Sequence, residues 1–179
     1  EATLGALIER LTEVSARLDG PTEAVFVVDG SPDGSLAVLR RLLPEARMRS
    51  QVVVHSRNFG SFPAIRTGLA TARGEYLGVM AADLQEPPEL MESFFSRLAS
   101  GECDVAVGRR ESRSDPAVSS IASRTFWWLY RRVVNPATPR GGVDVFGCTR
   151  EVAGQLLRLD EAHSSLVAQL YWIGYRRAE

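Results

Sequence analysis

The sequence predicts an α/β fold in which a mainly parallel central sheet carries helices on both faces. Three observations lead to this prediction. Short apolar runs alternate with segments whose apolar residues recur at helical spacing. The segments between the runs are long enough to hold the crossover helices that parallel strands require. With 179 residues, 45% of them hydrophobic, the chain can bury the core of one globular domain, and we expect a single domain over 1–179.

The elements are expected in the following order. A first helix over 4–18 has apolar residues at Leu4, Leu7 and Ile8 and ends before Gly20-Pro21. Strands are expected at 24–29, 51–55, 75–82, 103–107 and 143–148. Further helices are expected at 35–43, 62–72, 88–99, 121–134, 151–159 and 164–173. Polar motifs follow the first three strands, and in such sheets ligands bind at the carboxyl ends of the strands.

Composition excludes several kinds of chemistry. The net charge of −1 gives no electrostatic reason to expect a nucleic-acid partner. All 21 basic side chains other than histidine are arginine, which excludes a Schiff-base lysine and a P-loop lysine. Phosphate recognition must therefore use arginine, backbone N–H groups or a metal. Cys103 and Cys148 lack metal-ligand spacing, and no apolar run approaches the roughly 20 residues that span a bilayer.

Two of the polar motifs follow the first two strands. In Asp29-Gly30-Ser31-Pro32-Asp33, the carboxylate of Asp29 can accept from a base N–H or a ribose hydroxyl, although these residues also form ordinary turns. In 56–61, Arg57 and the N–H groups at a helix start suit a diphosphate, although a solvated loop would look the same. His55 and His163 belong to no ligand or nucleophile pattern, and we assign them no role.

The third motif, residues 82–89, follows the third strand. Asp83 and Gln85 offer oxygen ligands that suit Mg²⁺ or Mn²⁺ shared with substrate phosphates. An acidic helix start would give the same pattern. After the fourth strand, Arg110 and Arg113 lie in an arginine cluster that suits a second phosphate or a solvated loop. The aromatic residues Trp127, Trp128 and Tyr130 fit a buried core better than an acceptor groove or a membrane surface.

Together these motifs resemble family 2 glycosyltransferases of the GT-A fold, and especially the polyprenyl-phosphate (dolichyl-phosphate) mannosyl- and glucosyltransferases. The matching segments are 27–35, 56–76, 82–90, 107–113, 141–152 and 170–176. The resemblance implies a Rossmann-like sheet and inverting transfer of a sugar from a nucleoside diphosphate sugar to an acceptor, with polyprenyl phosphate expected first. A saccharide hydroxyl acceptor and a non-catalytic sugar-nucleotide-binding domain are the alternatives.

The resemblance also implies roles for individual residues. They are Asp29 at the nucleotide base; Arg57 and Arg66 at the donor's phosphates; Asn58 and Asp83 in the nucleotide-sugar site; Asp83 and Gln85 at a Mg²⁺ or Mn²⁺ ion; Arg110 and Arg113 at the acceptor phosphate; and Asp144 near the acceptor. Asp83 and Asp144 are the candidate catalytic residues, Asp144 as the base for a hydroxyl acceptor. A nicotinamide dehydrogenase is disfavoured, because no G-x-G-x-x-G follows a strand.

The sequence departs from the family pattern at two positions and at its ends. Ala81 replaces a usual acidic residue two positions before Asp83, which should weaken metal binding or shift it to Gln85, the diphosphate and water. Val28 replaces the first of two acids in the turn. The family's first strand and C-terminal segments are expected to lie outside this chain. The resemblance places the full-length protein at the cytoplasmic face of a membrane, contacting it through those segments.

Overall fold

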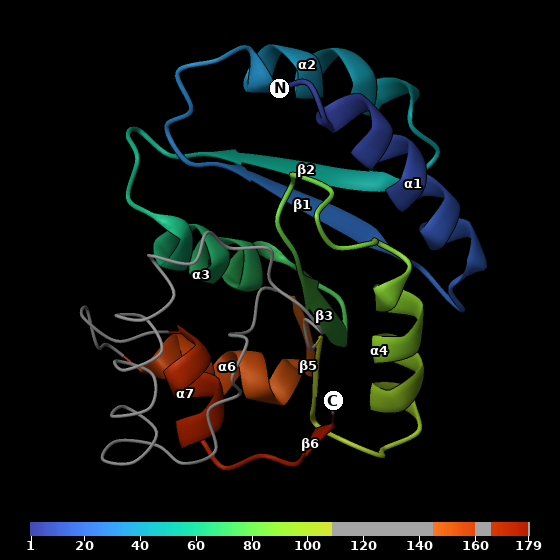
Figure 1. Ribbon diagram of the computed structural model, residues 1–179, viewed down its shortest axis with the longest axis vertical. Helices are drawn as coiled ribbons and strands as arrows, with labels where there is room; N and C mark the ends of the chain where they lie inside the picture. The colour runs from blue at the N-terminus through green and yellow to red at the C-terminus, as the bar shows by residue number, and fades with distance from the viewer. Residues whose placement is uncertain (109–144, 160–165, 179) are drawn as a thin grey trace, which may run out of the picture.

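The computed structural model describes residues 1–108, 145–159 and 166–178, and it confirms the α/β class (Figure 1). The described helices are α1 (Leu4–Arg17), α2 (Ser35–Leu42), α3 (Ser61–Thr71), α4 (Leu90–Ala99), α6 (Arg150–Arg158) and α7 (Leu166–Trp172), with a 3-10 turn η1 at Leu43–Glu45. The described strands are β1 (Glu23–Val28), β2 (Arg49–Val54), β3 (Tyr76–Val79), β4 (Val105–Val107), β5 (Phe146–Thr149) and β6 (Arg177–Ala178). The helix expected at 121–134 lies outside the described residues.

The described strands form two sheets rather than one. β1 and β2 pair in parallel, from Glu23 opposite Arg49 to Val28 opposite Val54. The second sheet has the order β3-β5-β4-β6, in which β5 runs antiparallel to both of its neighbours and β4 runs parallel to β6. The expected single, mainly parallel sheet therefore needs correction for the described strands. A buried strand shows the same continuous apolar run whether it pairs in parallel or antiparallel, so the sequence pattern carries no information on how β5 pairs.

Helices cover both faces of each sheet, as expected (Figure 1). α1 and α2 share a buried cluster with β1, which includes Leu7, Phe26 and Leu39. α3 packs on the opposite face, where Gly68 approaches Val27. The second sheet has α4 on one face and α6 and α7 on the other, each with its own buried cluster. The strand-end loops are thus carried by a core that is buried from both sides.

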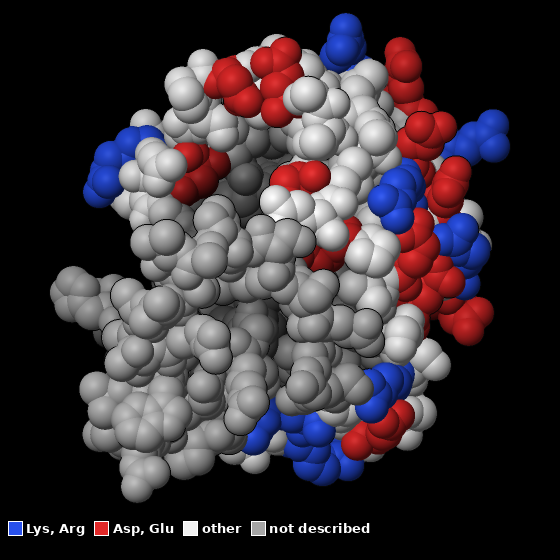
Figure 2. All heavy atoms as spheres, viewed as in Figure 1, with Lys and Arg blue, Asp and Glu red and all other residues white. Residues whose placement is uncertain are grey.

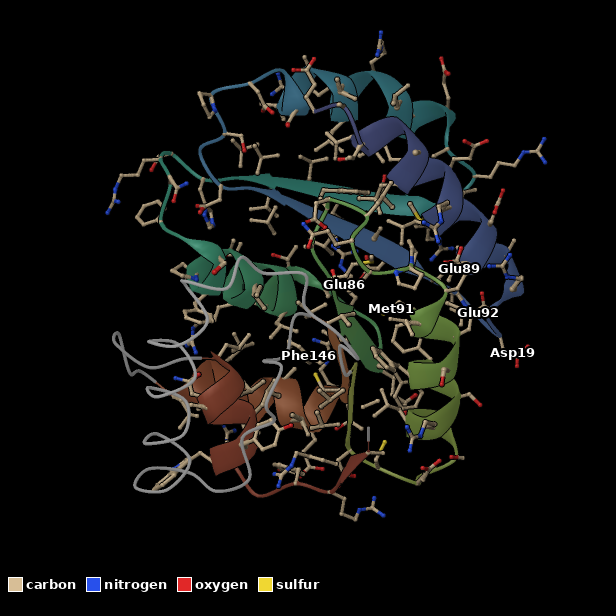
Figure 3. All side chains as sticks on the ribbon, viewed as in Figure 1. Asp19, Glu86, Glu89, Met91, Glu92 and Phe146 are labelled. Atoms are coloured by element: carbon tan, nitrogen blue, oxygen red, sulfur yellow. The ribbon has the colours of Figure 1, made fainter. Side chains whose placement is uncertain are left out.

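A row of small residues lets α4 lie close to the second sheet. The strand register aligns Gly78 of β3, Gly147 of β5 and Ala106 of β4. A Cβ atom on Gly147 would lie 3.0 Å from Cβ of Phe94, and one on Gly78 would lie 2.3 Å from Sδ of Met91. Figure 3 shows Met91 between α4 and β3. Because the segment from Met80 to Glu89 connects β3 to α4, this close packing sets the span of the Asp83 loop.

Ion pairs join α1 to α4 at the surface. Arg10 contacts Glu89, and Arg17 contacts Glu92 at 2.7 Å. Figure 3 shows Glu92 on α4 and Glu89 directly before it, both near α1. In both pairs the opposite charges hold one another. None of the helices in the described part of the chain is both long and apolar enough to cross a membrane.

Candidate functional site

The carboxyl ends of β1 and β2 bring two of the predicted motifs together. The parallel register places Val28 opposite Val54, so Asp29 and His55 leave the sheet side by side. The N–H of His55 extends the ladder by donating to the carbonyl of Val28 at 2.9 Å. The ring Nδ1 of His55 lies 2.7 Å from Oδ1 of Asp29. The acidic turn and the Arg57 loop, which are far apart in the sequence, therefore form one structural unit.

Asp29 holds the loop that precedes α3. The N–H of Phe59 donates to its Oδ1 at 2.9 Å, and the N–H of Gly60 donates to its Oδ2 at 2.7 Å. Gly60 is the N-cap residue of α3 and has φ of 98°. The carboxylate thus satisfies backbone donors at the helix start from a neighbouring strand, a position where negative charge is favoured. These N–H groups were expected to serve a diphosphate, but in the structure they serve Asp29.

The same contacts keep Asp29 ionised. The hydrogen bond from the Phe59 N–H lowers the pKa of Asp29 most, the bond with His55 lowers it further, and partial burial opposes both. A carboxylate offers about four acceptor positions, and the bonds from Phe59, Gly60 and His55 use three of them. Among the residues that the structure describes, only the Gly60 N–H bonds to Oδ2, which leaves one acceptor position there for a ligand. Asp29 therefore acts first as an anchor for the loop.

Gly30 allows the two loops to touch. Its φ of 62° lies in the left-handed region. A Cβ atom there would lie 2.3 Å from the carbonyl carbon of Arg57 and 2.3 Å from the nitrogen of Asn58. The close approach here is between the turn and the Arg57 loop, and any larger residue would force the loops apart.

Arg57 is presented at the surface by this loop. Its guanidinium lies 4.0 Å from the centroid of the Phe59 ring, and its Nη1 donates to the carbonyl of Asn58 at 3.1 Å. The Phe59 ring in turn meets the His55 ring edge-on, with centroids 5.4 Å apart. Arg57 and Asn58 are exposed. The guanidinium is thus oriented by an aromatic contact while most of its donors remain accessible to an anion.

Arg66 has different partners from those that the resemblance implied. It lies on α3, and its Nη1 and Nη2 donate to the carbonyls of Leu156 and Leu157 at 2.7 and 2.9 Å. These carbonyls belong to the end of α6, where backbone acceptors have few partners within the helix. The Leu156 carbonyl also accepts from the N–H of Leu159 at 3.3 Å. The guanidinium of Arg66 therefore links α3 to α6, and the structure does not bring it together with Arg57.

The Asp83–Gln85 segment forms a tight exposed turn after β3. The N–H of Gln85 donates to Oδ1 of Asp83 at 3.0 Å, and Thr3 Oγ1 donates to the carbonyl of Ala82 at 2.9 Å. Leu84 has φ of 62°, which is unusual for a residue with a branched side chain. Its side chain packs on the cluster that contains Val28, the residue before Asp29. Packing of Leu84 therefore holds a strained turn beside the end of β1.

Figure 2 shows acidic side chains around a hollow over the β1–β2 sheet, on the side where these strands end. Within the described residues, no group of three or more His, Cys, Asp or Glu side chains is arranged to hold a metal ion. Arg110, Arg113 and Asp144 lie outside the described residues, as do Trp127, Trp128 and Tyr130.

Sequence reasoning missed His55. A lone histidine matches no motif, and so we assigned it no role. The available signal was its position, because it follows a strand whose parallel neighbour ends in Asp29. In a parallel pair, residues that directly follow adjacent strands meet at the same edge.

A doubly covered α/β core with polar loops at the carboxyl ends of its strands is an architecture of nucleotide-binding proteins. The family model for glycosyl transferase family 2 matches residues 1–151 of the sequence. The chain therefore belongs to glycosyl transferase family 2.

Named relatives agree with this assignment. The chain is 34% identical over 115 residues to a dodecaprenyl-phosphate galacturonate synthase of Rhizobium johnstonii, covering 64% of this chain and 34% of the relative. It is 33% identical over 150 residues to an undecaprenyl-phosphate 4-deoxy-4-formamido-L-arabinose transferase of Aeromonas hydrophila, covering 83% of this chain and 44% of the relative. The chain thus spans less than half the length of either relative.

The fold is shared with a mannosyltransferase from Pyrobaculum calidifontis, solved in complex with GDP-Man and Mn²⁺. The TM-score is 0.64 at 20% sequence identity, covering 96% of this chain and 50% of that one. This likeness confirms the fold expected from the resemblance.

Proposed function

We propose that this chain carries the donor site of a glycosyltransferase that moves a sugar from a nucleoside diphosphate sugar to a polyprenyl phosphate. The observation that carries the proposal is the exposed Arg57 loop, clamped by Asp29 at the carboxyl end of β1. An exposed guanidinium on a rigid loop suits a diphosphate, whose oxygens it can contact in pairs. The names of the two relatives given above include dodecaprenyl phosphate and undecaprenyl phosphate, which supports this class of acceptor.

The residues at the Asp83 turn fit a divalent cation shared with the donor. Asp83 is exposed, and in the described part of the chain only its Oδ1 has a hydrogen-bond partner. Mg²⁺ is commonly held by one or two carboxylates together with substrate phosphates and water. Asp83 and Gln85 would hold Mg²⁺ or Mn²⁺, and the ion would supply positive charge to the departing diphosphate. With alanine at position 81, the donor's own phosphates must complete the ligand set.

The chemistry proposed is a single inverting displacement. An acceptor oxygen forms a bond to the anomeric carbon while the bond from that carbon to the diphosphate oxygen breaks. The electron pair of the broken bond leaves with the diphosphate. Arg57 binds the diphosphate and stabilises the charge that develops on it. The remaining acceptor position on Asp29 is available to the base or ribose of the donor, and Asn58 lies beside Arg57 in the same exposed loop.

The acceptor determines whether a base is needed. A phosphate acceptor is already anionic at neutral pH, and Arg110 and Arg113 are proposed to bind it. A saccharide hydroxyl would need a general base, for which Asp144 is the candidate. A polyprenyl acceptor also implies that the full-length protein works at a membrane surface, which we propose to be the cytoplasmic face.

The test is a transfer assay on the full-length protein with labelled nucleotide sugars, using polyprenyl phosphate and a free saccharide as alternative acceptors. Asp83→Ala should lower divalent-dependent transfer by roughly 100-fold or more, as loss of a group that stabilises a developing charge does. Asp19→Ala is the matched control, because Figure 3 shows Asp19 near the end of α1, far from the loop that bears Glu86. Full activity of the Asp83 variant would refute the site. Unchanged transfer in Asp144→Asn would remove Asp144 from the mechanism.

Ala81 favours one second candidate, a domain that binds sugar nucleotides without turning them over. This candidate predicts tight binding of a nucleotide sugar with neither transfer nor hydrolysis in the presence of Mn²⁺. Transfer to either acceptor by the unaltered protein would exclude it.

A further inference from the structure

His55 bridges three elements at the edge of the candidate site. Its Nδ1 lies 2.7 Å from Oδ1 of Asp29 at the end of β1, and its Nε2 lies 2.9 Å from Oγ1 of Thr67 on α3. The side chains of His55 and Asp29 are 14% and 17% exposed, so water competes little for these bonds. His55 itself directly follows β2. One imidazole thus fixes two strand ends to the helix that begins after the Arg57 loop.

The direction of these bonds follows from the partners. The carboxylate of Asp29 only accepts, since its lowered pKa keeps it ionised. Nδ1 of His55 must therefore carry the hydrogen. Nε2 then meets a hydroxyl, and the hydroxyl of Thr67 can donate to a neutral ring or accept from a protonated one. The bridge is satisfied in both charge states of the imidazole and acts as a fixed support.

The support reaches Arg57 by two routes. Through Asp29, His55 orients the carboxylate that binds the N–H groups of Phe59 and Gly60. Directly, its ring makes a T-shaped contact with the Phe59 ring, over which the Arg57 guanidinium lies. Gly60, the N-cap residue of α3, has no side chain that could cap the helix. The carboxylate of Asp29, which is distant in sequence, holds this helix start instead. Loss of the imidazole would free the carboxylate and remove the aromatic contact together.

We propose that His55 is a positioning residue, which holds the loop of residues 56–60 so that Arg57 meets the diphosphate of the donor. The inference rests on the proposed function in assigning the diphosphate to Arg57. It adds a residue that touches neither substrate nor metal, and whose effect is on donor affinity rather than on the chemical step.

The test combines a structural and a binding measurement on the full-length protein. Amide hydrogen exchange of Phe59 and Gly60 without ligand reports the clamp, and the Kd of UDP and GDP with Mn²⁺ reports donor binding. In His55→Ala, both amides should lose protection, and Kd for the nucleotide that binds should rise about tenfold or more, as loss of a hydrogen bond to a charged group does. Turnover at saturating donor should change by less than about threefold, because the weakened contact binds the ground state and the transition state equally.

Two variants separate positioning from general destabilisation. His55→Asn keeps a side-chain donor near the position of Nδ1 and should restore most of the protection and affinity. Thr67→Val removes only the second contact and should have a smaller effect than His55→Ala. If His55→Ala retains protected amides and a normal Kd, the proposal is wrong.

Arg57→Met distinguishes failure of the inference from failure of the proposed function. If His55 acts through Arg57, adding His55→Ala to Arg57→Met should raise Kd no further. Full additivity of the two changes would overturn the proposed route. If Arg57→Met alone leaves Kd unchanged, the diphosphate assignment fails and takes with it the link from His55 to donor binding. Amide exchange then still decides whether His55 holds the loop.

Discussion

Replacing Gly147 by alanine should destabilise the protein by forcing α4 away from the second sheet. The added Cβ would lie 3.0 Å from Cβ of Phe94 and 3.3 Å from Cδ1 of Leu98. The Cβ of Phe94 is fixed to the helix backbone, so relief requires movement of α4 itself. Overpacking of this kind costs about 1–3 kcal/mol. At Gly78 the nearest atom is Sδ of Met91, whose flexible side chain can move, so alanine there should cost less.

The measurement is urea-induced unfolding followed by circular dichroism, with free energies compared at equal slope. Gly154→Ala is the matched control, because Gly154 sits inside α6 and, in the described part of the chain, no atom outside its neighbours and the helix's own backbone lies within 4 Å of an added Cβ. That change should stabilise the protein by about 0.5–1 kcal/mol. The close packing of α4 is refuted if Gly147→Ala unfolds at the same urea concentration as the unaltered protein, or proves more stable than Gly154→Ala.

Three further outcomes follow from the contacts described. Burial raises the pKa of Cys148 to about 12 and also raises that of Cys103, so neither thiol should react with a disulfide reagent until urea unfolds the protein. Rapid reaction of either thiol in the native state would contradict the buried positions of the two cysteines. Arg66→Met should lower the unfolding free energy by about 1.5–3 kcal/mol, because two carbonyls of α6 lose a charged donor, and it should leave nucleotide affinity unchanged. An unchanged unfolding free energy together with weakened nucleotide binding would instead support a phosphate role for Arg66. The pKa of Asp29 is lowered from 3.8, chiefly by the Phe59 N–H and then by His55, so its contribution to stability is complete above that pH and is lost as pH falls through the folded-state pKa. The unfolding free energy should therefore fall less on acidification in Asp29→Asn than in the unaltered protein, and identical pH dependence of the two would refute the clamp.

Much of the fold was predictable because burial leaves a periodic trace. Leu4, Leu7 and Ile8 recur at helical spacing and are all buried in α1. The strand-end position of Asp29 was predictable for a similar reason, since a continuous apolar run stops at that carboxylate. Pairing was harder to predict. The apolar run of β5 does not encode its antiparallel direction, and β6 has only two residues, too few to form a pattern.

The individual contacts at the site depend on three-dimensional proximity that spacing does not reveal. The side chain of Arg66 could point to a phosphate or to α6, and only the packing of α3 on α6 brings the carbonyls of Leu156 and Leu157 within reach. Leu84 gave no sign of its left-handed backbone, because that conformation is held by the turn at Asp83 and by packing of the leucine side chain. His55 likewise gains its role only from the register of two strands.

The central claim is that a divalent cation and a nucleoside diphosphate bind together at the Asp83 turn and the Arg57 loop. It is tested most directly by measuring the Kd of UDP and GDP with and without Mn²⁺, and the Kd of Mn²⁺ with and without the nucleotide. Linkage requires each ligand to tighten the other by the same factor. The account predicts a clear coupling in the unaltered protein and in Asp19→Ala, and its loss in Asp83→Ala. Nucleotide affinity that is independent of Mn²⁺, or a coupling that persists in Asp83→Ala, would contradict it.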